Sequence, residues 1–138
     1  MAILLKENIV TSSNLQNKKE VIHFIAERFY KCNYATQDFE KAMLEKEKVF
    51  DTAIGFGVAI PHAIETMKDT VLHSGLVIMT FPNGLQWGEK TVKFVVAIAA
   101  TGDEHMELLS KIALSCTSEE EVDRLSKLSQ DQLFQMFP

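Results

Sequence analysis

The sequence has few of the features that form disulfides or anchor a chain in a membrane. It holds two cysteines, Cys32 and Cys116, which are far apart and form no Cys-x-x-Cys pair, so we expect reduced thiols. The longest strongly apolar stretch, residues 92–100, is interrupted by Lys93 and falls well short of the roughly 20 residues that cross a bilayer. The first residues lack the charged-then-apolar order of a signal peptide. Together these absences predict a cytoplasmic protein.

Positively charged residues are outnumbered by acidic ones. The chain has 14 lysines and arginines against 19 aspartates and glutamates, which gives a net charge of −5 and a pI near 5.3. A protein that binds nucleic acid needs a basic face for the phosphates, so we expect no nucleic-acid partner. With 46% hydrophobic and 24% charged residues, the composition is ordinary for a globular protein. We therefore expect one folded domain over residues 1–138.

Motifs for nucleotide, metal and hydrolase chemistry are missing as well. No Gly-Lys-Ser or Gly-Lys-Thr follows the glycines at positions 55 and 57, so no sequence motif supports direct ATP binding. There is no His-Glu-x-x-His, no His-x-His pair and no Gly-x-Ser-x-Gly, which argues against a zinc site and a serine hydrolase. We expect neither a metal nor a cofactor.

Hydrophobic periodicity and capping residues predict an alternation of helices and strands. A helix is expected from Asn17, with Glu20 in the capping-box position, to Cys32–Asn33. A second helix is expected over residues 36–48, and three more are expected to begin near residues 102, 118 and 129. The remaining expectations are a loop over residues 51–57, a turn at 82–84, and strands over 9–10, 58–60, 70–81 and 91–100, of which the last two should pair antiparallel. This order predicts an α/β sandwich, with a mixed sheet flanked by helices on both faces.

His62 ends the most unusual segment of the chain. Gly55 and Gly57 allow backbone conformations that other residues resist, and Pro61 fixes its own φ while it holds Ile60 extended. The histidine is therefore presented from a stiff position at a strand end, and a pre-positioned nucleophile loses little orientational freedom in the transition state. The residues alone also allow a second interpretation, in which His62 has no functional role and lies in an ordinary glycine-containing loop. That is the more common case.

A second histidine, His105, is expected in the first turn of the helix that begins near residue 102. Free N–H groups at a helix start favour anions and disfavour protonated imidazole, so His105 should be neutral and able to donate one hydrogen bond. From the residues alone, a histidine simply packed at a helix start is again the more common case. The buried face of this helix is predicted to consist of Met106, Leu109, Ile112 and Ala113.

Four separated segments resemble one known family. The stretch Gly55-x-Gly57-Val58-Ala59-Ile60-Pro61-His62 is similar to the active-site segment of enzyme IIA domains of the bacterial phosphoenolpyruvate-dependent sugar phosphotransferase system, fructose–mannitol class. Residues 42–47 upstream, and 71–76 and 102–112 downstream, extend the resemblance over essentially the whole chain. The last two segments look closest to the mannitol branch.

The resemblance implies a function and its partners. His62 would accept a phosphoryl group from the phosphohistidine of the carrier HPr and pass it to a cysteine of enzyme IIB, for uptake and phosphorylation of a sugar, mannitol for the branch it most resembles. The protein would approach the membrane only through the permease. His105 would orient the phosphorylated histidine. Lys46 stands where the family usually has arginine, so it would supply positive charge without the planar fork of a guanidinium.

Two other functions are compatible with the same residues. One is a regulatory protein of this fold, in which the phosphorylation state of His62 controls a binding partner instead of transport. The other is a non-catalytic relative that only binds partners. Because a phosphocarrier must dock reversibly, we expect a partly apolar rim around His62, with Phe56, Val58 and Ile64 as candidates.

Overall fold

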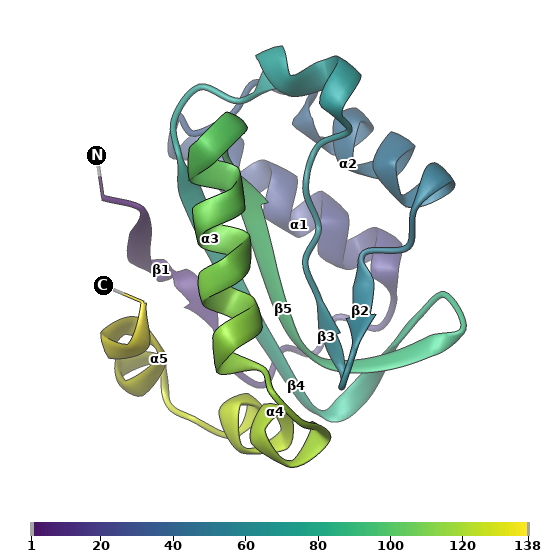
Figure 1. The fold of residues 1–138 in the computed structure, drawn as a ribbon, viewed down its shortest axis with the longest axis vertical. Coiled ribbons are helices and arrows are strands. Elements are labelled where there is room, and N and C mark those ends of the chain that lie inside the picture. The colour runs from purple at the N-terminus through teal and green to yellow at the C-terminus, as the bar shows by residue number, and fades with distance from the viewer. Residues whose placement is uncertain (1, 138) are drawn as a thin grey trace.

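The computed structural model describes residues 2–137 and contains one five-stranded mixed sheet (Figure 1). The strands are β1 (Leu4–Val10), β2 (Ala53–Gly55), β3 (Val58–Ala59), β4 (Gly75–Trp87) and β5 (Lys90–Ala99). They lie in the order β1-β4-β5-β3-β2. The pairs β1–β4 and β3–β5 are parallel, whereas β4–β5 and β2–β3 are antiparallel. The sheet is therefore mixed, as predicted, and β1 and β2 form its two edges.

Helices cover both faces of this sheet (Figure 1). One core contains the buried side chains of α1 (Lys18–Lys31) and α2 (Phe39–Val49) against Val77, Met79 and Val95. The other contains side chains of α3 (Gly102–Ser115), α4 (Glu119–Ser126) and α5 (Gln130–Met136) against Ile78 and Val96. Successive strand residues thus alternate between two apolar cores, as the two-residue repeat of a strand requires. The predicted sandwich is confirmed.

Three predicted helix starts are confirmed by their capping hydrogen bonds. The side chain of Asn17 accepts from the backbone N–H of Glu20 at 2.9 Å, and Ser118 accepts in the same way at the start of α4. Ser129 and Gln132 form a complete reciprocal capping box at the start of α5. Such caps satisfy backbone donors that have no partner within the helix.

The boundaries around β4 differ from the prediction. Glu65–Thr70 forms a short 3-10 helix, η1, and β4 begins only at Gly75. Pro82 and Gly84 lie within β4, where the register with β5 shifts, and the chain reverses later, between Trp87 and Lys90. Gly84 has a φ of +89°, so these turn-forming residues produce a bulge in a long strand instead of a hairpin turn. The segment predicted as a loop over residues 51–57 also contains β2.

The predicted buried face of α3 is partly wrong. Ile112 is buried and Leu109 is half-buried, but Met106 and Ala113 are exposed. Leu114, which was not assigned to that face, is exposed as well. The helix therefore packs on the sheet mainly through its C-terminal half, where Ile112 is its fully buried residue.

Candidate active site

His62 follows β3 at the point where the chain leaves the sheet. The backbone is fixed on both sides of it: the carbonyl of Pro61 accepts from Ile98 N–H in β5 at 3.0 Å, and Ile64 N–H donates to the carbonyl of Ala42 in α2 at 3.0 Å. The side chain of His62 is half-buried. The predicted stiff presentation of this residue thus has a specific cause, because a central strand and a helix clamp its two flanks.

The hydrogen bond of the His62 ring assigns its protonation pattern. Its Nδ1 lies 2.8 Å from the carbonyl oxygen of Ile60. A carbonyl can only accept, so Nδ1 carries the proton and donates it. In the neutral ring the lone pair is then on Nε2, which makes Nε2 the nucleophilic atom.

The His105 ring lies directly beside His62, and α3 holds it there. The two ring centroids are 4.8 Å apart, with 59° between the ring planes. Burial lowers the pKa of His105, and the charges of His62 and Lys46 lower it further, while Glu65 opposes them. His105 is therefore neutral at pH 7 and can donate one N–H to an anion in the space next to His62.

Lys46 lies on α2, close to the two histidines. Its ammonium Nζ is 3.0 Å from Oε1 of Glu65, the first residue of η1, and its side chain is 14% exposed whereas that of Glu65 is 75% exposed. Backbone hydrogen bonding and the contact with Lys46 hold the pKa of Glu65 below its usual value. The Glu65 carboxyl is therefore ionised at neutral pH, and it pairs with a largely buried ammonium.

A cleft of about 120 Å³ lies beside the two histidines. It is lined by His62, His105, Glu65 and Lys68, and by residues 100–102, where α3 begins. The N-cap residue Thr101 makes no side-chain hydrogen bond to the helix, so the first N–H groups of α3 remain available to a bound anion. The cleft thus combines a nucleophile, a neutral imidazole and a helix N-terminus, which suits a phosphoryl group.

Not every residue that we expected around His62 lies there. Phe56 is exposed, but it sits in the β2–β3 turn, at the other end of β3, and Val58 is buried in the core. Ile64 is half-buried beside the site. Glu65 and Lys68 also line the cleft and were not predicted, because their positions depend on η1, an element without a clear sequence pattern.

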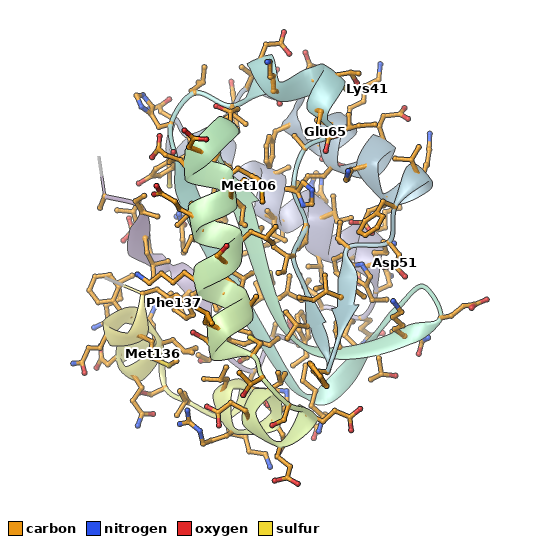
Figure 2. All side chains as sticks on the ribbon, viewed as in Figure 1. Lys41, Asp51, Glu65, Met106, Met136 and Phe137 are labelled. Carbon is orange, nitrogen blue, oxygen red and sulfur yellow. The ribbon has the colours of Figure 1, made fainter. Side chains whose placement is uncertain are left out.

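Two further properties concern the described residues, 2–137. In this range no three His, Cys, Asp or Glu side chains are grouped so that they could hold a metal ion. No helix in it has the length and apolar character needed to span a bilayer. Figure 2 shows how the side chains surround the fold, with Glu65 and Met106 on the part of the surface near the start of α3.

Comparison with known proteins places this chain in a family. A family model described as "Phosphoenolpyruvate-dependent sugar phosphotransferase system, EIIA 2" matches residues 2–137. The chain is 38% identical to the mannitol-specific phosphotransferase enzyme IIA component of Bacillus subtilis (strain 168), over 99% of this chain and 97% of that protein. The same component of Geobacillus stearothermophilus is 36% identical, over 96% and 92% of the two chains.

Solved structures agree in fold. The crystal structure of IIA mannitol from Escherichia coli has a TM-score of 0.85 at 30% identity and covers 96% of both chains. The structure of enzyme IIA in complex with phosphorylated enzyme IIB, both of the E. coli mannitol system, gives a TM-score of 0.85, with 95% and 94% covered. The nitrogen regulatory protein IIA-Ntr from Neisseria meningitidis shares the fold, with a TM-score of 0.82 at 20% identity. This chain belongs to the enzyme IIA type 2 family of the phosphoenolpyruvate-dependent sugar phosphotransferase system and is a phosphotransferase component.

Proposed function

We propose that Nε2 of His62 accepts a phosphoryl group from phosphorylated HPr and passes it to a cysteine of a mannitol-type enzyme IIB. The observation that carries the proposal is the geometry of the two imidazoles. The bond from His62 Nδ1 to the Ile60 carbonyl leaves Nε2 free to attack, and His105 lies 4.8 Å away between ring centroids. Family membership indicates the class of reaction, and the similarity to mannitol-specific relatives indicates which sugar is taken up.

The transfer needs only positioning and charge stabilisation. The Nε2–P bond forms while the N–P bond of the donor phosphohistidine breaks, and the proton on Nδ1 stays in its hydrogen bond to Ile60. In-line phosphoryl transfer leaves little covalent work to the protein, because the negative charge stays on the three equatorial oxygens. The donor already carries an activated phosphoryl group, so the site requires no nucleotide.

The groups around the cleft would stabilise those oxygens. Neutral His105 offers one N–H donor, and the uncapped start of α3 offers backbone N–H groups. Lys46 provides positive charge, but its ammonium is bound to Glu65 before transfer. An arriving phosphoryl group would therefore compete with the Glu65 carboxylate for the same cation.

Exposed apolar side chains beside the cleft suit transient docking. Met106 follows His105 in α3 and is 58% exposed. The Phe50 ring, also 58% exposed, lies 5.5 Å from the Lys46 ammonium. Scattered apolar contacts without a deep pocket fit a partner that must leave after each transfer. We assign this surface to HPr and enzyme IIB in turn, which also makes the cytoplasm the expected location.

Labelling with phosphorylated HPr tests the proposal. The wild-type protein should acquire one acid-labile, alkali-stable phosphoryl group, and His62→Ala should acquire none. The exposed His73 provides a matched control, because His73→Ala should be labelled like the wild type. Stoichiometric labelling of His62→Ala would show that another residue is the acceptor.

The second transfer separates a carrier from a regulator. Phosphorylated protein mixed with a mannitol enzyme IIB should lose its label to that partner. A protein that is labelled on His62 but never donates to enzyme IIB would be a regulatory relative. His105→Ala should accept the label but donate it slowly, if His105 acts on the phosphorylated state.

A further inference from the structure

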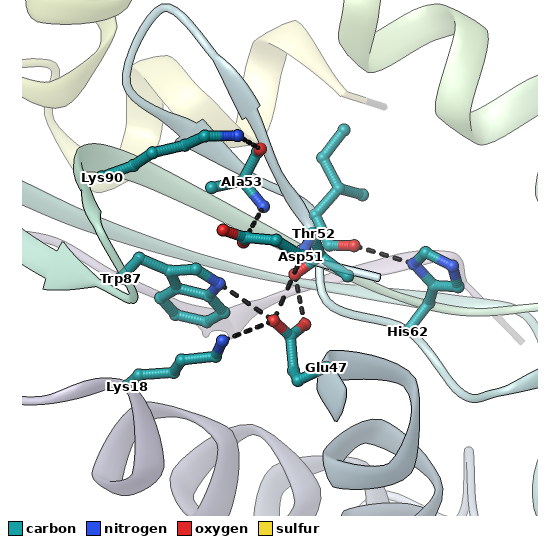
Figure 3. A network of polar contacts seen from close by, with 9 residues as sticks. Lys18, Glu47, Asp51, Thr52, Ala53, His62, Trp87 and Lys90 are labelled. Carbon is teal, nitrogen blue, oxygen red and sulfur yellow. Dashed lines mark hydrogen bonds and ion pairs between the residues drawn. The ribbon is translucent and has the colours of Figure 1, made fainter. Parts of the chain in front are cut away.

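A buried carboxylate, Glu47, lies close to the active-site strand without lining the cleft. It is on α2, its side chain is 6% exposed, and it forms an ion pair with one other part of the chain and accepts hydrogen bonds from two more (Figure 3). Lys18 Nζ at the start of α1 lies 2.8 Å from it, and Trp87 Nε1 at the end of β4 lies 3.2 Å from it. The third partner is Thr52, which donates through both its hydroxyl and its backbone N–H.

Thr52 links this carboxylate to the active site through two backbone steps. The Thr52 carbonyl accepts from the N–H of Ile60 at 2.9 Å, and the Ile60 carbonyl accepts from Nδ1 of His62 at 2.8 Å. A continuous series of hydrogen bonds therefore runs from Glu47 through Thr52 and Ile60 to the ring of His62. Figure 3 shows Glu47, Thr52 and His62 in one view.

The Ile60 carbonyl depends on this series of hydrogen bonds because its own peptide group lacks an N–H. The following residue is Pro61, so this peptide has no N–H that could fix its plane. Its orientation is instead set by its neighbours: Ile98 holds Pro61 on one side, and Thr52 holds Ile60 on the other. If the hydrogen bond between Ile60 N–H and the Thr52 carbonyl is lost, the Ile60 carbonyl, which keeps the proton on Nδ1 of His62, is free to rotate.

Thr52 in turn has little support from the sheet. It precedes β2, a three-residue edge strand that pairs only with β3. Asp51 closes a local turn by accepting from Ala53 N–H at 2.9 Å, and Lys90 donates to the Ala53 carbonyl at 2.8 Å. Neither of these bonds connects Thr52 to a helix, so Glu47 is the group through which α2 holds it.

Stability alone is a poor reason for a buried ion pair at this place. Removing a carboxylate and an ammonium from water is costly, and apolar side chains of similar volume often give an equally stable core. A carboxylate that accepts three hydrogen bonds and pairs with an ammonium, however, fixes the geometry of all four groups. We propose that Glu47 is a positioning residue for phosphoryl transfer, which acts through Thr52 and Ile60 to keep the proton on Nδ1 of His62 and Nε2 free; the proposal rests on the proposed role of His62.

The decisive comparison uses three variants of the same network. Glu47→Ala removes the acceptor of Thr52. Glu47→Gln keeps an oxygen for the N–H donors, and its amide can donate to the Thr52 hydroxyl, which is also an acceptor. Lys18→Met is the matched control, since it removes the cation but leaves Glu47 bonded to Thr52 and Trp87.

Two measurements separate positioning from stability. The first is the two-bond ¹H–¹⁵N correlation spectrum of the imidazoles at about pH 8, where an ordinary histidine is neutral, which reports the tautomer of His62 without any partner protein. The second is the rate of labelling by phosphorylated HPr. Unfolding midpoints in urea give the stability of each variant.

We expect Glu47→Ala to place part of the His62 proton on Nε2 and to slow labelling by roughly ten- to a hundredfold, the range for misplaced reacting groups. Glu47→Gln should restore the Nδ1–H tautomer and most of the rate. Lys18→Met should lower the unfolding midpoint but leave tautomer and rate unchanged. If Glu47→Ala does not fold, Thr52→Val, which removes the hydroxyl donor at nearly constant volume, takes its place under the same criteria.

A wild-type tautomer and rate in folded Glu47→Ala would overturn the proposal, as would equal losses of rate in Lys18→Met. The tautomer measurement does not depend on whether phosphorylated HPr is the phosphoryl donor. If the wild-type protein is not labelled by phosphorylated HPr, the proposed function fails, while the tautomer spectra still decide whether Glu47 controls the His62 ring.

Discussion

The ammonium of Lys46 and the carboxylate of Glu65 form an ion pair at 3.0 Å, and Glu65 also lines the cleft that contains His62. The cation is largely buried and the anion is largely exposed, so Glu65 can swing into solvent while Lys46 stays. This asymmetry suits a site that is alternately empty and occupied by a phosphoryl group.

We therefore expect Lys46→Met to slow phosphoryl transfer to His62 by about tenfold, because the equatorial oxygens lose one charged partner. Lys46→Arg should match or exceed the wild-type rate, since a guanidinium can bind two oxygens at once. Lys48→Met on the same helix is the control: the Lys48 side chain is 70% exposed and its ammonium pairs with Glu45. Rapid-quench labelling measures all three, and equal rates in Lys46→Met and the wild type would contradict the role.

Substitution of Glu65 should change the rate of phosphoryl transfer to His62 in the opposite direction. Glu65→Gln leaves Lys46 without its carboxylate partner, so a phosphoryl group no longer competes for that cation. We expect faster acceptance from phosphorylated HPr and slower donation to enzyme IIB, because the phosphorylated state is stabilised relative to the free one. Measured forward and reverse rates give the shift in equilibrium, and an unchanged equilibrium would mean that Glu65 and the phosphoryl group do not share Lys46.

The lowered pKa of His105 makes a prediction for stability in acid. Burial is its main cause, and the unfolded chain, with an ordinary pKa near 6.5, therefore binds a proton before the folded chain does. Stability must fall as the pH drops from about 6.5 through the folded pKa. His105→Gln should lose less stability than the wild type over this range, as measured by urea midpoints at about pH 7 and pH 5; parallel losses would contradict it.

The raised pKa of His23 predicts a pH dependence of stability with the opposite sign. Its ring contacts Glu40 at 2.8 Å and Glu27 at 3.2 Å, and these carboxylates raise its pKa. The stabilisation is complete below the unfolded pKa near 6.5 and is lost as the pH rises through the higher folded value. His23→Gln should thus be destabilised at about pH 5.5 and closely match the wild type at about pH 9.

Much of this fold follows from local sequence patterns. Asn17 and Ser129 mark helix starts because a capping side chain acts within three residues, and the Gly-x-Gly…Pro-His segment indicates a constrained histidine for the same local reason. The approach of His105 to His62 was implied by family resemblance, since nothing local joins residues 43 positions apart.

The remaining features depend on packing between distant segments. Glu47 and Trp87 are bonded across 40 residues, and Lys46 meets Glu65 only because η1 docks on α2. The apolar residues of α3 have helical spacing, but that spacing does not indicate which of them faces the sheet. Met106 was predicted to lie in the core for this reason, and the structure instead leaves it exposed, one residue after His105.

The exposed position of Met106 leads to a prediction about docking. We expect Met106→Asp to raise the KM for phosphorylated HPr and for enzyme IIB with little change in stability, because a charge would enter an interface that needs apolar contact. Leu114→Asp is the matched control, since Leu114 is 79% exposed on the same helix but lies at its far end from the cleft. Equal KM values for both variants would exclude this surface from docking.

Ile112 should link the stability of α3 to catalysis. It is the fully buried side chain of this helix, and α3 carries His105 in its first turn. Ile112→Ala should lower the free energy of unfolding by about 2–4 kcal/mol, the usual range for loss of a buried aliphatic side chain, whereas Leu114→Ala should change it by less than about 0.5 kcal/mol. Because α3 would also lose its anchor on the sheet, donation to enzyme IIB should slow in Ile112→Ala under conditions where the protein is fully folded. A variant that is destabilised but donates at the wild-type rate would show that His105 is held in place by its first turn alone.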